Sequence, residues 1–315
     1  MQSGSSWFCF ALTVFVLSAQ PPRRVAFLGP SITCGAGVTQ PFLPIVKAAL
    51  ERRFQTKIET YDLCFGGAHS FTTLLLLKHT ALPWKPDLVF VETGALDGFA
   101  PELSKPATEQ IFHELATAGI PAVFLARSTK CSEENTRLAI LQLARAYGFP
   151  AADVNASTLP DGCHPSNLGH AQIAAALLKA VDAAHKPRTP RFPAPLKTAK
   201  FQSAAQARTE GPAEQTPLTF FKESGAALKA QPGPVEWRMK FQGTLAAVLF
   251  RLGHTPAAME YQIDGGPWRK AAIQPAWFLN YYFETNLNVG PHELGLRLQA
   301  GPAGVILDGL ELDAH

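Results

Sequence analysis

Two short stretches of the chain hold residue types that could perform nucleophilic catalysis. Ser31 follows a short apolar run at residues 25–28, and far downstream Asp161 stands three positions before His164, ahead of a helix-like segment. A serine is a weak nucleophile unless a base takes its proton, and the base works best when a third group fixes its tautomer. These are the parts of a hydrolytic triad, and they indicate acyl transfer to water.

The elements around these residues predict an α/β domain. Between residues 24 and 184, apolar runs alternate with stretches of helical periodicity. The predicted strands span 25–28, 57–65, 87–92, 122–126 and 152–154, and the predicted helices span 42–54, 70–79, 106–118, 133–147 and 167–184. This alternation predicts a parallel sheet covered on both faces, with sites at the carboxyl ends of its strands. Ser31, Gly67, Gly94 and the loop 161–164 would lie at that edge.

The second half of the chain has a different pattern. Residues 187–217 are rich in proline and read as a linker or a strap along the surface. From residue 218 the helical period disappears, and short alternating runs separated by turn residues such as Asp264-Gly265-Gly266 predict an antiparallel β-sandwich. Its strands are expected at 237–241, 245–252, 258–263, 268–273, 281–285, 292–298 and 305–312.

Composition and the N-terminus limit the class of protein. The net charge of +3 is small and dispersed, which argues against a nucleic-acid partner. Residues 1–20 carry no charge and hold an apolar run, which predicts a secretory signal peptide cleaved near Ala19, although no basic residue precedes the run. The run is too short to span a membrane comfortably, so we expect a secreted or periplasmic protein without a stable membrane span. The sequence has no metal-ligand spacing, and we expect no metal and no other cofactor.

The cysteines fit an exported protein. Four remain after a signal peptide is removed: Cys34, Cys64, Cys131 and Cys163. We prefer the pairs Cys34–Cys64 and Cys131–Cys163, and the alternative is four buried thiols.

Residues 25–184 resemble the SGNH, or GDSL-type, hydrolase family. Its first block, commonly Gly-Asp-Ser-Ile-Thr-x-Gly, matches residues 29–35, and its last block, Asp-x-x-His-Pro, is intact at residues 161–165. The second block supplies a glycine that fits Gly67, and the third, Gly-x-Asn-Asp, aligns with residues 94–97. The resemblance implies a flavodoxin-like three-layer α/β/α SGNH hydrolase domain over 21–186, and a looser one implies a jelly-roll-like sandwich over 218–315.

The resemblance also implies roles for the site residues. Ser31 would be the nucleophile, His164 the base and Asp161 the group that orients the base. The backbone N–H groups of Ser31 and Gly67 would form the oxyanion hole, and a glycine at 67 would let the backbone approach the reacting oxygen.

Two positions depart from the family pattern. Leu96 occupies the position of an asparagine whose amide donates to the oxyanion, and Pro30 replaces the aspartate before the nucleophile. Losing one such donor costs about 10²–10³ in rate. The enzyme could therefore be slower, could have lost catalysis, or could use another donor. Candidates for that donor are His69, Ser70 and Thr93.

Each motif also has an interpretation in which its residues have only a structural role. Ser31 alone could be a helix N-cap, the Asp161-Gly162 pair alone a turn, and Asp97 a loop or cap carboxylate. The aromatic residues of the sandwich could be core residues or a stacking surface for sugars. These are Trp268, Trp277, Phe278, Tyr281 and Tyr282.

Together these features predict an exported serine ester hydrolase, a carbohydrate O-acetylesterase whose substrate is an acylated glycan or another small-acyl ester. Two alternatives stay open. One is a lipase- or thioesterase-like hydrolase on the same triad, and the other is a catalytically impaired protein that binds carbohydrate.

Overall fold

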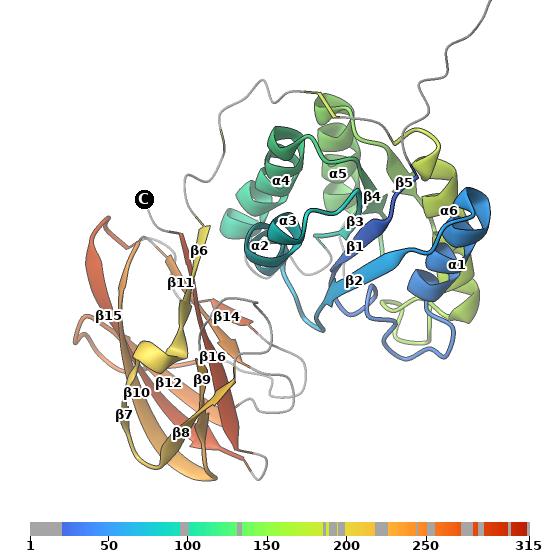
Figure 1. The fold of residues 1–315 in the computed structure, drawn as a ribbon. Helices are drawn as coiled ribbons and strands as arrows, with labels where there is room; N and C mark the ends of the chain where they lie inside the picture. The colour runs from blue at the N-terminus through green and yellow to red at the C-terminus, as the bar shows by residue number, and fades with distance from the viewer. Residues whose placement is uncertain are drawn as a thin grey trace, which may run out of the picture.

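The computed structural model describes most of the chain (Figure 1). The described residues are 21–94, 101–130, 134–184, 187–188, 194, 199–217, 226–243, 245–250, 256–271, 280–282, 287–301 and 304–313, and some of these, including 101–105, 245–247 and 280–282, only by their backbone. The predicted signal peptide at 1–20 lies outside this part, as do Leu96, Asp97 and Cys131.

The first domain is built on a five-stranded parallel sheet. Its strands are β1 (Arg24–Gly29), β2 (Glu59–Cys64), β3 (Leu88–Glu92), β4 (Ala122–Ala126) and β5 (Ala151–Asp153), in the order β2-β1-β3-β4-β5. This is the order of a flavodoxin-like doubly wound fold. Strands β3 and β4 are buried along their whole length, which explains the apolar runs at 88–91 and 122–126.

Helices cover both faces of this sheet (Figure 1). They are α1 (Phe42–Phe54), α2 (Ser70–Leu76), the π-helical turn η1 (Leu77–Ala81), α3 (Leu82–Trp84), α4 (Pro101–Ala118), α5 (Glu134–Tyr147) and α6 (Asn167–Val181). Helix α1 packs beside α6 on one face, while α2 and α5 both pack against α4 on the other. Three layers result, as predicted, although the segment predicted as one helix at 70–79 continues through η1 and α3 to Trp84.

The second domain is an antiparallel sandwich of two sheets. One sheet has the order β13-β12-β15-β10-β7 and the other β14-β11-β16-β9-β8, with β6 also pairing with β16. The strands are β6 (Ala199–Ser203), β7 (Arg208–Glu210), β8 (Ala213–Pro217), β9 (Ala226–Ala230), β10 (Gly233–Gln242), β11 (Leu245–Phe250), β12 (Ala258–Ile263), β13 (Arg269–Lys270), β14 (Asn280–Tyr282), β15 (Pro291–Ala300) and β16 (Val305–Asp313). Trp237, Phe250 and Leu296 lie in the core between the sheets.

The linker predicted at 187–217 is wrong for its second half. Residues 199–217 form β6, β7 and β8, and these strands pair within the two sheets of the sandwich. The prolines misled the prediction because β7 and β8 are edge strands, with Pro212 between them and Pro217 ending β8. Edge strands tolerate proline because one side of the strand needs no ladder hydrogen bond.

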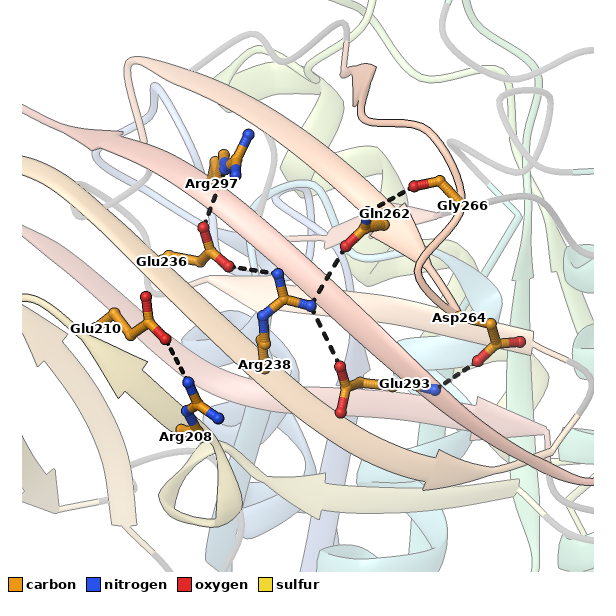
Figure 2. Close-up of polar contacts among 9 residues, drawn as sticks. All are labelled: Arg208, Glu210, Glu236, Arg238, Gln262, Asp264, Gly266, Glu293 and Arg297. Carbon is orange, nitrogen blue, oxygen red and sulfur yellow. Dashed lines mark hydrogen bonds and ion pairs between the residues drawn. The ribbon is translucent and has the colours of Figure 1, made fainter.

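The outer face of the sheet that contains β10 carries charged residues in pairs (Figure 2). Glu236 accepts hydrogen bonds from Arg238 and Arg297, and Arg238 also donates to Glu293 and Gln262. The charged residues among them line an open groove of about 840 Å³, together with Arg208, Glu210 and Lys240. Because the opposite charges are paired, this face is a polar surface with little net charge.

The two domains touch through the other sheet of the sandwich. Phe201 of β6 and Leu249 of β11 pack with the apolar cluster between the parallel sheet and helices α2 and α4. Neighbouring Val248 and Phe250 point the opposite way, into the sandwich core. Among the described residues, no helix is long and apolar enough to cross a membrane.

Candidate active site

The structure brings Ser31, His164 and Asp161 together into one hydrogen-bonded relay. Ser31 Oγ lies 2.9 Å from His164 Nε2, and His164 Nδ1 lies 2.8 Å from Asp161 Oδ2. The His164 side chain is only 14% exposed, while that of Asp161 is 45% exposed. Both distances lie within the range at which a base can accept a serine proton while a carboxylate holds the imidazole tautomer.

Ser31 stands in a tight turn directly after β1. The N–H groups of Cys34 and Ala36 donate to the carbonyl oxygens of Pro30 and Ser31, which closes the turn. Gly29 precedes it, and a Cβ at that position would come within 2.2 Å of Thr33 Oγ1. The turn therefore requires a residue without a side chain at position 29.

A disulfide fastens this turn to the neighbouring strand. Cys34, three residues after Ser31, is bonded to Cys64 at the end of β2, which confirms the first preferred pairing. Cys163 is also disulfide-bonded. Because Cys131 lies outside the described residues, the pairing of Cys163 with Cys131 stays a prediction.

The loop that carries His164 is held by its own carboxylate. Asp161 Oδ1 accepts hydrogen bonds from the backbone N–H groups of Cys163 (2.9 Å) and His164 (3.0 Å), while Oδ2 faces the imidazole. Partial burial raises the pKa of Asp161, but the hydrogen bonds from His164 and Cys163 outweigh it, so the pKa lies below its usual value. Asp161 is therefore ionised at neutral pH.

Helix α6 begins just after this loop. Ser166 caps the helix, its Oγ accepting from the N–H of Gly169 at 3.2 Å. The segment behind the loop is fixed by a hydrogen bond from Leu159 N–H to the His164 carbonyl oxygen (2.7 Å). The base therefore sits on a loop braced at both ends.

Two backbone N–H groups are available for an oxyanion hole. Gly67 has a φ of +78° in the turn after β2, a conformation that favours glycine. Among the residues that the structure describes, neither the Ser31 nor the Gly67 N–H has a hydrogen-bond partner. Leu96, at the position of the family's asparagine, lies outside the described residues.

The structure does not favour Ser70 or Thr93 as replacement donors. Both are buried, and their hydroxyl groups are hydrogen-bonded to each other. Ser70 Oγ also accepts from the Gly94 N–H (3.1 Å) and the Thr108 hydroxyl (2.8 Å). This network holds Gly94 at the end of β3. His69, the third candidate, is likewise buried, at the N-terminus of α2.

Two buried charged residues beneath the relay were not among the candidates predicted from the sequence. Glu92 ends β3 and Arg127 directly follows β4, and their side chains are 3% and 5% exposed. Burial raises the pKa of Glu92 and lowers that of Arg127, while their mutual attraction opposes both shifts. The sequence indication that was available is a charged residue directly after each of two apolar runs, at 88–91 and at 122–126.

The structure bears on two further sequence-based questions, a metal site and an aromatic surface for sugars. In the described part of the chain, no group of three or more His, Cys, Asp or Glu could hold a metal ion. The Trp268 ring is covered by the guanidinium of Arg297, 3.9 Å from the ring centroid. Trp277, Phe278 and the side chains of Tyr281 and Tyr282 lie outside what the structure describes, so the sugar-stacking surface stays a hypothesis.

Comparison with solved structures extends over both domains. A two-domain esterase active on acetylated mannans superposes with a TM-score of 0.72 and 19% identity, over 93% of this chain and 92% of that one. Its co-crystal with mannopentaose gives the same TM-score at 16% identity, over 93% of this chain and 90% of the other. The chain has the fold of a two-domain esterase. No protein-family model matches the sequence, and a search of curated proteins finds no match.

Proposed function

We propose that the protein is a serine ester hydrolase that removes small acyl groups, with acetylated polysaccharide as its substrate. The observation that carries the proposal is the unbroken relay from Ser31 Oγ through His164 to Asp161, with distances of 2.9 and 2.8 Å. The fold shared with an esterase active on acetylated mannans supports the choice of substrate class.

The proposed reaction has two stages. Ser31 Oγ attacks the ester carbonyl carbon while His164 Nε2 takes the serine proton, and His164 then protonates the alcohol that leaves. Water attacks the resulting acyl-serine, His164 takes a proton from that water, and the acid departs as Ser31 Oγ regains its proton. Asp161 stabilises the imidazolium in both stages.

The negative charge that develops on the carbonyl oxygen requires donors. The N–H groups of Ser31 and Gly67 would supply two of them. Preorganised donors of this kind account for a large part of catalysis in such sites, and one donor is worth about 3–4 kcal/mol. With leucine in place of the asparagine amide, we expect hydrolysis to be slower on unactivated esters than on activated ones.

The test compares the wild-type protein with Ser31→Ala and with the matched control Ser157→Ala, a serine outside the relay. Hydrolysis of p-nitrophenyl acetate, butyrate and octanoate is measured, along with acetate release from acetylated mannan. We expect activity that decreases with acyl length, that is lost in Ser31→Ala by at least about 10³-fold, and that is retained in Ser157→Ala.

Other outcomes would redirect the proposal. Equal background from wild type and Ser31→Ala would refute the esterase and leave a protein that binds carbohydrate. A preference for octanoate would instead indicate a lipase-like hydrolase on the same relay.

A further inference from the structure

The turn that holds Ser31 makes a buried contact with β3. Thr33, two residues after Ser31, donates a hydrogen bond from Oγ1 to Glu92 Oε2 over 2.7 Å. Thr33 is 2% exposed and Glu92 3% exposed, so water does not compete for this bond. A shift of the Glu92 carboxylate would therefore move the turn that carries Ser31.

The loop that holds His164 makes a buried contact with the end of β4. Arg127 Nη2 donates to the carbonyl oxygen of Cys163, the residue before His164, over 2.6 Å. The donor is charged and buried, which makes this hydrogen bond stronger than a neutral one at the surface. The position of the His164 backbone therefore depends on where the guanidinium lies.

The two contacts are joined by the pairing of β3, which ends at Glu92, with β4, which Arg127 directly follows. Glu92 lies beside Leu125 in the parallel register of β3 and β4, and Arg127 follows two residues later. Each charge opposes the effect of burial on the pKa of the other. Buried charged residues contribute little to stability compared with well-packed apolar residues, so stability alone does not explain Glu92 and Arg127.

We propose that Glu92 and Arg127 are positioning residues that set the distance between Ser31 and His164. Glu92 holds the nucleophile turn through Thr33, Arg127 holds the base loop through the Cys163 carbonyl, and the pairing of β3 with β4 fixes the two residues relative to each other. Neither residue touches substrate, since both are buried. The inference rests on the proposed ester hydrolysis.

The main test is the double variant Glu92→Gln/Arg127→Met, which removes both charges and leaves neither one buried alone. We expect kcat on p-nitrophenyl acetate to fall by about 10–100-fold while KM stays within about 2-fold, because an error of about 1 Å between reacting groups can cost about 10² in rate. The labelling of Ser31 by a fluorophosphonate should slow by a similar factor, and this readout does not depend on substrate binding.

Two further variants separate positioning from folding. Thr33→Val keeps the shape of the side chain and removes only the bond to Glu92, and we expect a decrease in kcat of about 3–10-fold. Arg137→Met is the control. This arginine of α5 pairs with Glu134 of the same helix and with Asp153 of the edge strand β5. It should keep the wild-type kcat and labelling rate.

The outcomes distinguish the inference from the function on which it rests. A folded double variant with wild-type kcat and labelling rate would overturn the inference while the esterase stands. If the double variant does not fold, wild-type kcat and labelling in Thr33→Val overturn it, and slowed labelling there supports it. A wild-type protein no more active than Ser31→Ala would refute the proposed function itself.

Discussion

At the scale of single residues, the environment of His170 shows how burial chooses a protonation state. Its side chain is fully buried in α6, Nδ1 accepts a hydrogen bond from the Phe42 N–H (3.2 Å), and the ring stacks on Phe42. Burial, with the nearby charges of Arg127 and His164, lowers the pKa of His170 to about 4. The folded protein therefore holds this imidazole neutral.

This environment predicts a pH-dependent loss of stability. Between pH 4 and 6.5 the unfolded chain binds a proton at His170 that the folded chain does not, because the pKa of an unperturbed histidine is 6.5. The free energy of unfolding should therefore fall as the pH drops from 6.5 to 4, by up to about 3 kcal/mol from this group. Urea unfolding at several pH values measures it.

The matched variants are His170→Asn, whose Oδ1 can accept from the Phe42 N–H without titrating, and His113→Asn on the surface of α4. His170→Asn should flatten the pH dependence in this window, whereas His113→Asn should leave it unchanged. Equal slopes in wild type and His170→Asn would show that other groups cause the acid loss.

At the scale of elements, the site depends on turns that are fastened to one another. The disulfide Cys34–Cys64 joins the turn of Ser31 to the end of β2, three residues before Gly67. The nucleophile and the second proposed oxyanion donor are therefore linked covalently through a short path. This link limits how far either turn can move away from the other.

Removing this disulfide should affect both stability and rate. For a sequence separation of 30 residues, loop entropy predicts that Cys34→Ala/Cys64→Ala loses about 3–4 kcal/mol of unfolding free energy. We also expect kcat for p-nitrophenyl acetate to fall at temperatures where the variant is folded. Substitution is preferable to a reductant because Cys163 is disulfide-bonded too. Unchanged unfolding and kcat would mean that hydrogen bonds alone hold the two turns.

At the scale of the whole molecule, the domains share a hydrophobic cluster. Leu249 of the sandwich is 2% exposed and belongs to the apolar cluster beneath α2 and α4, with Phe201 packed against it. Apolar contact of this kind couples the unfolding of the two domains, because separating them exposes the cluster to water.

Truncating this contact should uncouple the domains. Leu249→Ala removes a buried side chain at a cost of about 2–5 kcal/mol, and calorimetry should show two separated transitions in place of one cooperative transition. Leu168→Ala, at a leucine that is 61% exposed on α6, is the control and should leave the profile unchanged. Identical profiles for both variants would show that the contact does not couple the domains.

Much of the fold could be predicted from the sequence, because strands and helices leave patterns within their own segments. Burial on both faces leaves uninterrupted apolar runs, as in β3 and β4, and a helix leaves its 3.6-residue period, so the alternation of strands and helices is recorded within each segment. The Asp161–His164 spacing places both groups on one short loop, where they can pair whatever the rest of the chain does. A parallel sheet places that loop and Ser31 at the same edge, because the carboxyl ends of its strands lie there.

Tertiary structure alone decided what depends on distant partners. The prolines of 187–217 predicted a linker, but strands β7 and β8 form there because two sheets offer them an edge to pair with. Glu92 and Arg127 are ordinary charged residues in sequence, and only the register of β3 and β4 places them together below the relay. Edge pairing and buried charge both depend on neighbours far along the chain, which no local pattern records.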